Sequence, residues 1–233
     1  MKNLNLKDTG SNNYGIVESI NLLKTNIAFC GDDVRVITLT SCLPGEGKSS
    51  IAFELAKSLA RSDNKVLLID ADIRKSKFLR TRGVRGVDRG LTHYLSGQAD
   101  LKDIFYRLNI KNIAFIPTGP SVPNPTELIE NERFTKLIEV SRKVYNYIII
   151  DATPIGAVID AAIVAKQCDG IVMVIEQAKT SRRMVGQAIE QLKRTETRIL
   201  GAVLNKVDAS SSEYYYGHYK EYGNNMSKRE GKK

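Results

Sequence analysis

The chain has 233 residues, which is enough for one α/β domain with a complete core and too few for two. Apolar residues make up 42% of the sequence and charged residues 26%, an ordinary globular balance that excludes wholesale disorder. The formal net charge of +9 indicates attraction to phosphates, anionic lipids or acidic partners and does not choose among them.

The cysteines and the apolar runs limit the class of protein further. Cys30, Cys42 and Cys168 lie far apart and are odd in number, so we expect neither a disulfide framework nor a zinc site. No apolar run approaches the roughly 20 residues that a membrane-spanning helix needs. The polar stretch 1–15 lacks the apolar segment of a secretory signal. We therefore expect a cytoplasmic protein.

An amphipathic helix is predicted in the N-terminal segment, residues 1–33. Its apolar residues recur at helical spacing and form one stripe. The stripe consists of Ile16, Ile20, Leu23 and Ile27, and the other face carries Glu18, Asn21 and Lys24.

Residues 34–208 alternate between short apolar runs and helical patterns. Runs rich in β-branched residues and without strict alternation are typical of strands buried on both faces. They cover 34–40, 65–70, 112–117, 147–151, 170–176 and 198–205. Helical patterns follow Lys48 and cover 127–144, 157–166 and 181–196. This alternation predicts an α/β fold with a doubly wound, mostly parallel sheet, in which ligands bind beyond the carboxyl ends of the strands.

A glycine-rich loop joins the first predicted strand to the helix after it. Strand, loop, Lys-Ser pair and helix together are typical of a P-loop NTPase, whose loop N–H groups and helix N-terminus surround phosphate oxygens. The residues expected to bind the nucleotide are Gly45, Glu46, Gly47, Lys48, Ser49 and Ser50. Lys48 would bridge the β- and γ-phosphates of ATP, and Ser49 would offer its hydroxyl to Mg²⁺.

Two further expectations concern side chains of this loop. Because Lys48 belongs to a surface loop, we expect its replacement to leave the fold intact. Cys42 stands where the usual first glycine of the loop would be. If the positive field of the loop stabilised its thiolate, Cys42 would make the protein sensitive to oxidation.

Three aspartates follow the predicted strands. Asp70 and Asp72 end the second strand, and Asp151 ends the fourth, where it fits a Walker-B-type role. Mg²⁺ prefers carboxylate and water oxygens, so the expected metal ligands are Ser49, Asp70, Asp72 and Asp151. Asp70 and Asp72 would face the same ligand only if the strand end twists. Helix capping is the alternative role for aspartates at such positions.

A basic run follows the second of these strands. It consists of Arg74, Lys75, Lys77, Arg80, Arg82, Arg85 and Arg89. The run is either a solvated face or a surface for phosphotyrosine, anionic lipid or an acidic partner, and the sequence does not decide between the two.

The C-terminal segment, residues 209–233, is rich in tyrosine. It contains five of the ten tyrosines of the chain among serine, glycine, asparagine and lysine, which predicts a flexible tail. The five are Tyr214, Tyr215, Tyr216, Tyr219 and Tyr222.

Five strings that cover most of the chain together resemble the bacterial tyrosine kinases of capsular and exopolysaccharide synthesis. They are LPGEGKSS (43–50), LLIDADIRKS (67–76), GLTHYLSG (90–97), GPSVPNPTELI (119–129) and DATPIGAVIDAA (151–162). The segment 124–128 within the fourth string is the most specific, because nucleotide chemistry alone does not require it.

The resemblance implies an ATP- and Mg²⁺-dependent kinase domain over 34–208 that phosphorylates the tyrosines of its own tail. It implies Lys48, Asp70, Asp72 and Asp151 as the catalytic residues. In that family the aspartates after the second strand help to hold the metal and accept the proton of the attacking tyrosine. A phenol with a pKa of about 10 is protonated at neutral pH, so such an acceptor makes chemical sense.

The resemblance also implies partners. The family's cytoplasmic kinases are activated by the cytoplasmic segment of a membrane-embedded polysaccharide co-polymerase, which would recruit this chain to the inner face of the membrane. The family assembles into rings through an N-terminal Glu-x-x-Arg-x-x-Arg helix, where this chain has Glu18, Asn21 and Lys24. Because two arginines are replaced, we expect weak self-association. No nucleic-acid partner is expected.

Three other functions remain open from the residues. A partitioning or septum-positioning ATPase of the MinD and ParA type shares the fold, but Leu43 replaces the signature lysine of that class. A GTPase is suggested by the Asn-Lys-Val-Asp string at 205–208, but Pro154 stands where that class has glycine. A regulator that binds nucleotide without transferring phosphate is the third. Phosphotyrosine on the purified protein, dimerisation on ATP and a comparison of ATP with GTP binding would separate them.

Overall fold

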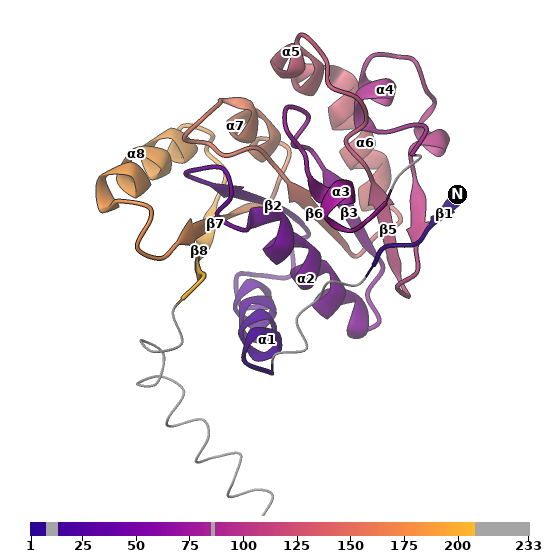
Figure 1. Ribbon diagram of the computed structural model, residues 1–233. Helices are drawn as coiled ribbons and strands as arrows, with labels where there is room; N and C mark the ends of the chain where they lie inside the picture. Colours follow the sequence, from indigo (N-terminus) through magenta and orange to yellow (C-terminus); the bar gives the residue numbers. More distant parts are fainter. Residues whose placement is uncertain (8–13, 85–86, 208–233) are drawn as a thin grey trace, which may run out of the picture.

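An eight-stranded sheet forms the centre of the computed structural model, which describes residues 1–7, 14–84 and 87–207 (Figure 1). The strands in spatial order are β1 (Lys2–Leu4), β4 (Tyr106–Leu108), β5 (Ile113–Ile116), β3 (Val66–Asp70), β6 (Tyr147–Asp151), β2 (Val36–Ser41), β7 (Gly170–Glu176) and β8 (Ile199–Asn205). All neighbouring strands are parallel except β4 and β5, which are antiparallel. The predicted α/β class and mostly parallel sheet are confirmed.

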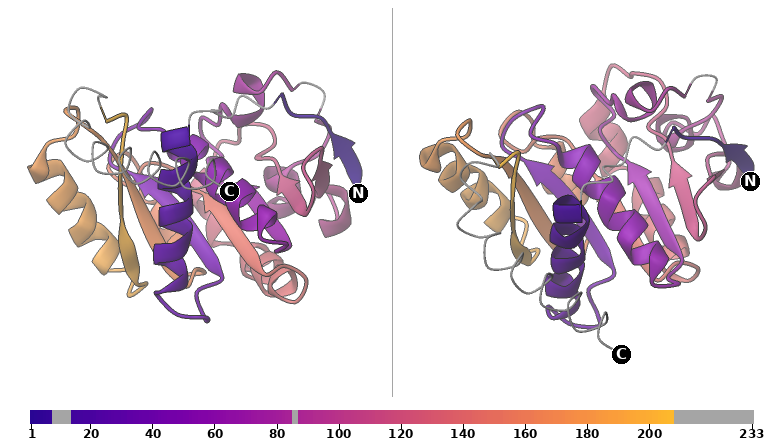
Figure 2. Two further views of the ribbon diagram at one scale, coloured as in Figure 1. Left: turned by 90° about the horizontal axis from the view of Figure 1, so that it is seen from below. Right: turned by 60° about the horizontal axis from the view of Figure 1, so that its bottom comes forward.

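Helices cover both faces of this sheet. The first face carries α1 (Tyr14–Ala28), α2 (Lys48–Arg61) and the short α3 (Phe78–Thr81), and α1 lies beside α2 (Figure 2). The second face carries α4 (Leu91–Leu95), α5 (Pro125–Glu130), α6 (Glu132–Arg142), α7 (Asp160–Ala165) and α8 (Arg182–Lys193), with the 3-10 helix η1 at Leu101–Asp103. In the described part of the chain, no helix has the length and apolar character to cross a bilayer.

The central strands are buried on both faces, which explains their continuous apolar runs. In β3, Val66 and Leu68 pack against the α1 and α2 side, whereas Leu67 and Ile69 pack against the opposite layer. Strand β6 alternates in the same way. Because both layers remove apolar side chains from water, the sheet has two cores and no polar face at its centre.

Local differences from the predicted elements have local causes. Strands β1 and β4 were not predicted, because each has only three residues and carries no long apolar run. The helix predicted at 127–144 is two helices, because Asn131 has extended backbone angles and its side chain accepts a hydrogen bond from the N–H of Arg133 at the start of α6. The helix predicted from residue 157 begins at Asp160.

The sheet topology brings several polar residues to one edge. Strands β2, β3, β6 and β7 are parallel neighbours, so their carboxyl ends meet. Asp70 at the end of β3 is the register partner of Asp151 at the end of β6. Asn205 of β8 pairs in the same way with Glu176 of β7. This is the edge at which doubly wound sheets bind ligands.

Candidate active site

The glycine-rich loop connects the end of β2 at Ser41 to the start of α2 at Lys48. Gly45 and Gly47 have φ angles of 86° and 94°, in the left-handed region that side chains rarely adopt. A Cβ atom on Gly47 would lie 2.0 Å from Nδ2 of Asn205. Both the backbone conformation and the close approach of β8 therefore require glycine at position 47.

Two side chains at the end of β8 donate hydrogen bonds to the backbone of the loop. Asn205 donates a hydrogen bond from Nδ2 to the carbonyl oxygen of Glu46 at 2.8 Å. Lys206 donates from Nζ to the carbonyl oxygen of Gly45, also at 2.8 Å, and its Nζ lies 3.0 Å from the Glu176 carboxylate. These residues begin the string that resembles a guanine-reading motif. In this structure their side chains support the phosphate-binding loop.

Glu46 belongs to the same loop and supports it through its own side chain. Its side chain is fully buried and accepts hydrogen bonds from the N–H of Leu43 at 2.6 Å and the N–H of Glu176 at 3.1 Å. It also accepts a hydrogen bond from the Thr180 hydroxyl. The Glu46 carboxylate therefore connects the loop to the end of β7 and the segment after it. Only the backbone of Glu46 is left to contact a phosphate. Sequence patterns do not indicate this role, because Thr180 lies 134 positions away.

Lys48 is buried between two of the predicted carboxylates. Its Nζ lies 2.7 Å from Oδ1 of Asp151 and 3.8 Å from Oδ2 of Asp72, and only 7% of the residue is exposed. Burial lowers the pKa of Lys48, but attraction to Asp151 and Asp72 outweighs this effect, so the pKa lies above its ordinary value. Lys48 is therefore charged, and the expectation of an exposed surface-loop residue is wrong.

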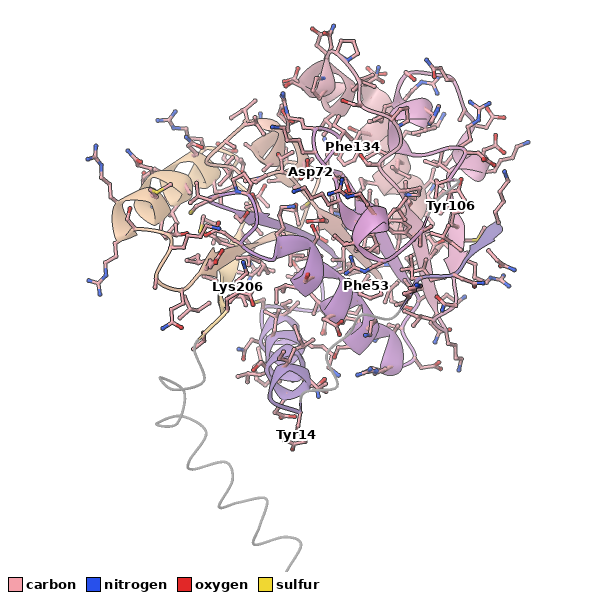
Figure 3. All side chains as sticks on the ribbon, viewed as in Figure 1. Tyr14, Phe53, Asp72, Tyr106, Phe134 and Lys206 are labelled. Carbon is pink, nitrogen blue, oxygen red and sulfur yellow. The ribbon has the colours of Figure 1, made fainter. Side chains whose placement is uncertain are left out.

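Asp70 lies deeper than Asp72, and the strand end presents both residues to the site. The Asp70 side chain accepts hydrogen bonds from the Ser76 hydroxyl and from the N–H of Asp72, and the residue is 1% exposed. Burial and the neighbouring Asp151 carboxylate raise the pKa of Asp70 to about 8, although Ser76 and Lys48 oppose this change. Asp72 is more accessible, with 16% of its side chain exposed (Figure 3).

The donor atoms at this edge fit a magnesium ion that is bound together with a nucleotide. Among the described residues, no group of three carboxylate, histidine or cysteine side chains is placed to bind a metal ion by itself. Within the same residues, Oδ2 of Asp151 and Oγ1 of Thr153 are buried and have no hydrogen-bond partner. Mg²⁺ commonly binds one or two carboxylates and completes its shell with phosphate and water oxygens. Asp151 offers such an oxygen, and Ser49 follows Lys48 in the first turn of α2.

Asp70 should make the nucleotide-free protein less stable as pH rises. The folded state raises the pKa of this carboxyl above its unfolded value of about 4, so the folded protein binds the proton more tightly. Stability should fall between about pH 4 and pH 8 as that proton is lost, because the loss of hydration and the repulsion from Asp151 and Asp72 outweigh the stabilisation of the new charge by Ser76 and Lys48. Asp70→Asn mimics the neutral acid, so its melting temperature should fall less over this range.

Thermal melting between pH 5 and pH 9 would measure this difference. The exposed Asp103→Asn serves as the matched control and should keep the wild-type slope. An Asp70→Asn protein with the wild-type slope would show that Asp70 does not hold the proton.

Other predicted residues have different outcomes. Burial and the nearby Glu46 raise the pKa of Cys42 to about 11, so the prediction of a stabilised, oxidation-sensitive thiolate is wrong. The basic run is not one solvated face: Arg82 is buried against the rings of Phe53 and Phe78, and Arg74 pairs with Asp160. The five tyrosines of the predicted tail, Tyr214, Tyr215, Tyr216, Tyr219 and Tyr222, lie outside the described residues.

Comparison with known proteins identifies the family of this chain. A family model described as an AAA domain matches residues 34–205. The tyrosine-protein kinase CpsD of Streptococcus agalactiae is 44% identical over 212 residues, which cover 91% of this chain and 92% of that protein. The kinase domain of the Escherichia coli tyrosine kinase ETK has a TM-score of 0.76 at 28% identity, covering 83% of this chain and 78% of that chain.

A second structural likeness concerns one of the alternatives. The septum site-determining protein MinD of Pyrococcus horikoshii, solved with Mg-ADP, has a TM-score of 0.65 at 22% identity, covering 77% of this chain and 76% of that chain. This likeness shows a shared fold.

The parallel sheet, the glycine loop and the buried lysine define a P-loop NTPase domain. The chain belongs to the AAA domain family and to the family of tyrosine-protein kinases that includes CpsD. The resemblance that the five sequence strings indicated is therefore confirmed.

Proposed function

We propose that this protein transfers the γ-phosphate of ATP to tyrosine hydroxyls, with Mg²⁺ as cofactor, and acts in capsular or exopolysaccharide synthesis. Its own tyrosines between 214 and 222 are the proposed main acceptors. The observation that carries the proposal is the buried Lys48 between Asp72 and Asp151 at the mouth of the phosphate-binding loop, in a chain 44% identical to a tyrosine-protein kinase.

The roles of the individual residues follow from their positions. The backbone of the loop at 45–47 and the charge of Lys48 hold the phosphates, while Ser49, Asp72 and Asp151 provide oxygens for the metal. Bound Mg²⁺ would neutralise charge on the phosphate oxygens. In this arrangement, Lys48 shifts from its carboxylate partners toward the phosphates when the nucleotide binds.

The transfer step needs a proton acceptor near the incoming phenol. The tyrosine oxygen forms a bond to the γ-phosphorus, the bond to the oxygen that bridges the β- and γ-phosphates breaks, and ADP leaves. The phenolic proton passes to a carboxylate. Asp72 is the proposed acceptor because its side chain is the more exposed of the pair after β3, whereas Asp70 lies behind it. Most of the acceleration comes from positioning and charge neutralisation.

The proposed activator is the cytoplasmic segment of a membrane-embedded polysaccharide co-polymerase, which would bring the kinase to the inner face of the membrane. The test is incubation of the purified protein with ATP and Mg²⁺, with and without a peptide of that segment. We expect phosphotyrosine to form and the peptide to increase its rate. ATP turnover without phosphotyrosine in both arms would instead support a nucleotide-driven switch.

We also propose that α1 mediates weak self-association. Glu18 is exposed on this helix. Asn21, however, accepts a hydrogen bond from Ser58 of α2 at 2.9 Å, and Lys24 donates one at 3.0 Å to Ser62, the residue that follows α2 in the same chain. Exposed ion pairs contribute about 0 to 1 kcal/mol each and weaken in salt. Light scattering should therefore show assemblies at low salt that become smaller at high salt. A strict monomer at all salt concentrations, with and without the activator peptide, would contradict this proposal.

A further inference from the structure

Three segments that are distant in the sequence meet at a buried carboxylate beside the active site. Asp160, the first residue of α7, is fully buried. Arg74 donates two hydrogen bonds to it, from Nε at 2.6 Å and from Nη2 at 3.0 Å. The hydroxyl of Thr126 in α5 donates to the same carboxylate at 2.9 Å and accepts from Nη2 of Arg74 at 2.9 Å. We call these three residues the Asp160 network.

Arg74 lies in the middle of the loop that carries Asp72. The N–H of Lys75 donates to Oδ1 of Asp72 at 3.1 Å, and the N–H of Ser76 donates to the carbonyl oxygen of Asp72 at 3.1 Å. The hydroxyl of Ser76 in turn donates to the carboxylate of Asp70. The loop is therefore a compact hydrogen-bonded turn, and Arg74 connects this turn to α5 and α7 on the second face of the sheet.

Stability alone does not explain the pair of Arg74 and Asp160. The Asp160 carboxylate is buried, although 34% of the Arg74 side chain is exposed. A pair with a buried member is often no more stabilising than well-packed apolar side chains of similar volume, because the buried charge loses its hydration. A planar guanidinium that makes two hydrogen bonds to one carboxylate does, however, fix direction as well as distance. The geometry of the Asp160 network therefore suits a role in orientation.

We propose that Asp160 is a positioning residue, which acts through Arg74 to hold the Asp72 carboxylate beside Lys48. Thr126 extends the network to α5, and this gives a function to the segment 124–128, which nucleotide chemistry does not require. The inference rests on the proposed kinase function, because it assigns Asp72 a part in the reaction. Outer partners that orient metal-binding or catalytic groups typically contribute about 10- to 100-fold to affinity or activity.

The decisive variant is the double substitution Arg74→Met with Asp160→Leu. Arg74→Met alone leaves a buried carboxylate without its cation and should lower the melting temperature. The double variant removes both charges, so its melting temperature should return close to the wild-type value. Its kcat for phosphotransfer should remain at least about tenfold below wild type. Its affinity for a fluorescent ADP analogue without Mg²⁺ should change less than about twofold, because the phosphate-binding loop is untouched.

The chain offers a matched control at the other end of the sheet. Arg142 donates to both oxygens of Asp169, at 2.9 and 2.7 Å, in a second pair with two hydrogen bonds. Asp169 also accepts backbone hydrogen bonds from Arg35 and Val36 at the start of β2. Arg142→Met should lower the melting temperature and leave kcat unchanged. In α5, Thr126→Val should lower kcat, and Thr126→Ser, which keeps the hydroxyl, should restore it.

The same set of proteins distinguishes the possible failures. If the double variant has wild-type kcat and the wild-type gain in ADP-analogue affinity on adding Mg²⁺, the Asp160 network is only structural and the inference is wrong. If the affinity without Mg²⁺ falls as much as kcat, Arg74 binds phosphate directly and the inference is also wrong. If the wild type forms no phosphotyrosine, the proposed function fails. The gain in ADP-analogue affinity on adding Mg²⁺, compared between the wild type and the double variant, then decides whether the network orients Asp72.

Discussion

Lys48→Met is expected to lower phosphotransfer by at least about a thousandfold, the scale on which cations at transferring phosphoryl groups act. The substitution removes the positive charge that lies between Asp72 and Asp151 at the mouth of the loop. The rate of phosphotyrosine formation at saturating ATP measures this loss. Lys193→Met is the matched control, because Lys193 forms an exposed pair with Glu190 on α8 and should be dispensable.

The same substitution should also destabilise the nucleotide-free protein. Lys48 and Asp151 form a buried pair, and breaking such a pair by removing one partner costs about 3 to 5 kcal/mol. Denaturant unfolding measures this cost. Lys48→Met with Asp151→Asn removes both charges and should regain much of the stability without regaining activity. Normal phosphotransfer by folded Lys48→Met protein would contradict the proposed mechanism.

Changing the five tyrosines between 214 and 222 to phenylalanine is expected to remove nearly all phosphotyrosine without lowering ATP affinity. The environment of the other tyrosines supports this expectation. Tyr94 and Tyr106 are buried, at 5% and 3% exposed, and Tyr145 and Tyr147 are half-buried. A hydroxyl that is packed into the fold cannot enter an active site without local unfolding.

Tyr14 provides the control for this experiment. It is 82% exposed at the start of α1, so it is the most exposed tyrosine within the described residues. Tyr14→Phe should leave the amount of phosphotyrosine unchanged. Mass spectrometric mapping of wild-type protein should place the phosphates between residues 214 and 222. Phosphate on Tyr14, or undiminished phosphotyrosine in the variant that lacks the five tyrosines, would show that the acceptor is elsewhere.

The parts of the molecule that sequence patterns predicted are those with strong local signals. Strands β2, β3, β5, β6, β7 and β8 carry continuous apolar runs, and the glycine loop has its lysine at a fixed spacing. The pairing of Asp70 with Asp151 follows from the parallel topology, since both end adjacent strands. These features depend on neighbours in the sequence or on the general rules of parallel sheets.

The parts that sequence patterns missed depend on contacts between distant positions. The burial of Lys48 requires Asp151, which lies 103 positions away, and the Asp160 network joins Arg74 to a residue 86 positions away. No periodicity marks such pairs. Glu46 is polar and lies in a loop, and neither its residue type nor its position in the sequence indicates that its carboxylate is fully buried.

The proposed reaction is phosphorylation of tyrosine in the C-terminal segment of this same chain. The most direct measurement is the intact mass of wild-type and Lys48→Met protein after incubation with ATP, Mg²⁺ and the activator peptide, followed by mapping of phosphotyrosine. The proposed reaction predicts successive additions of one phosphate to the wild type, all between residues 214 and 222, and none to Lys48→Met. Hydrolysis of ATP by the wild type with no gain in mass would contradict it.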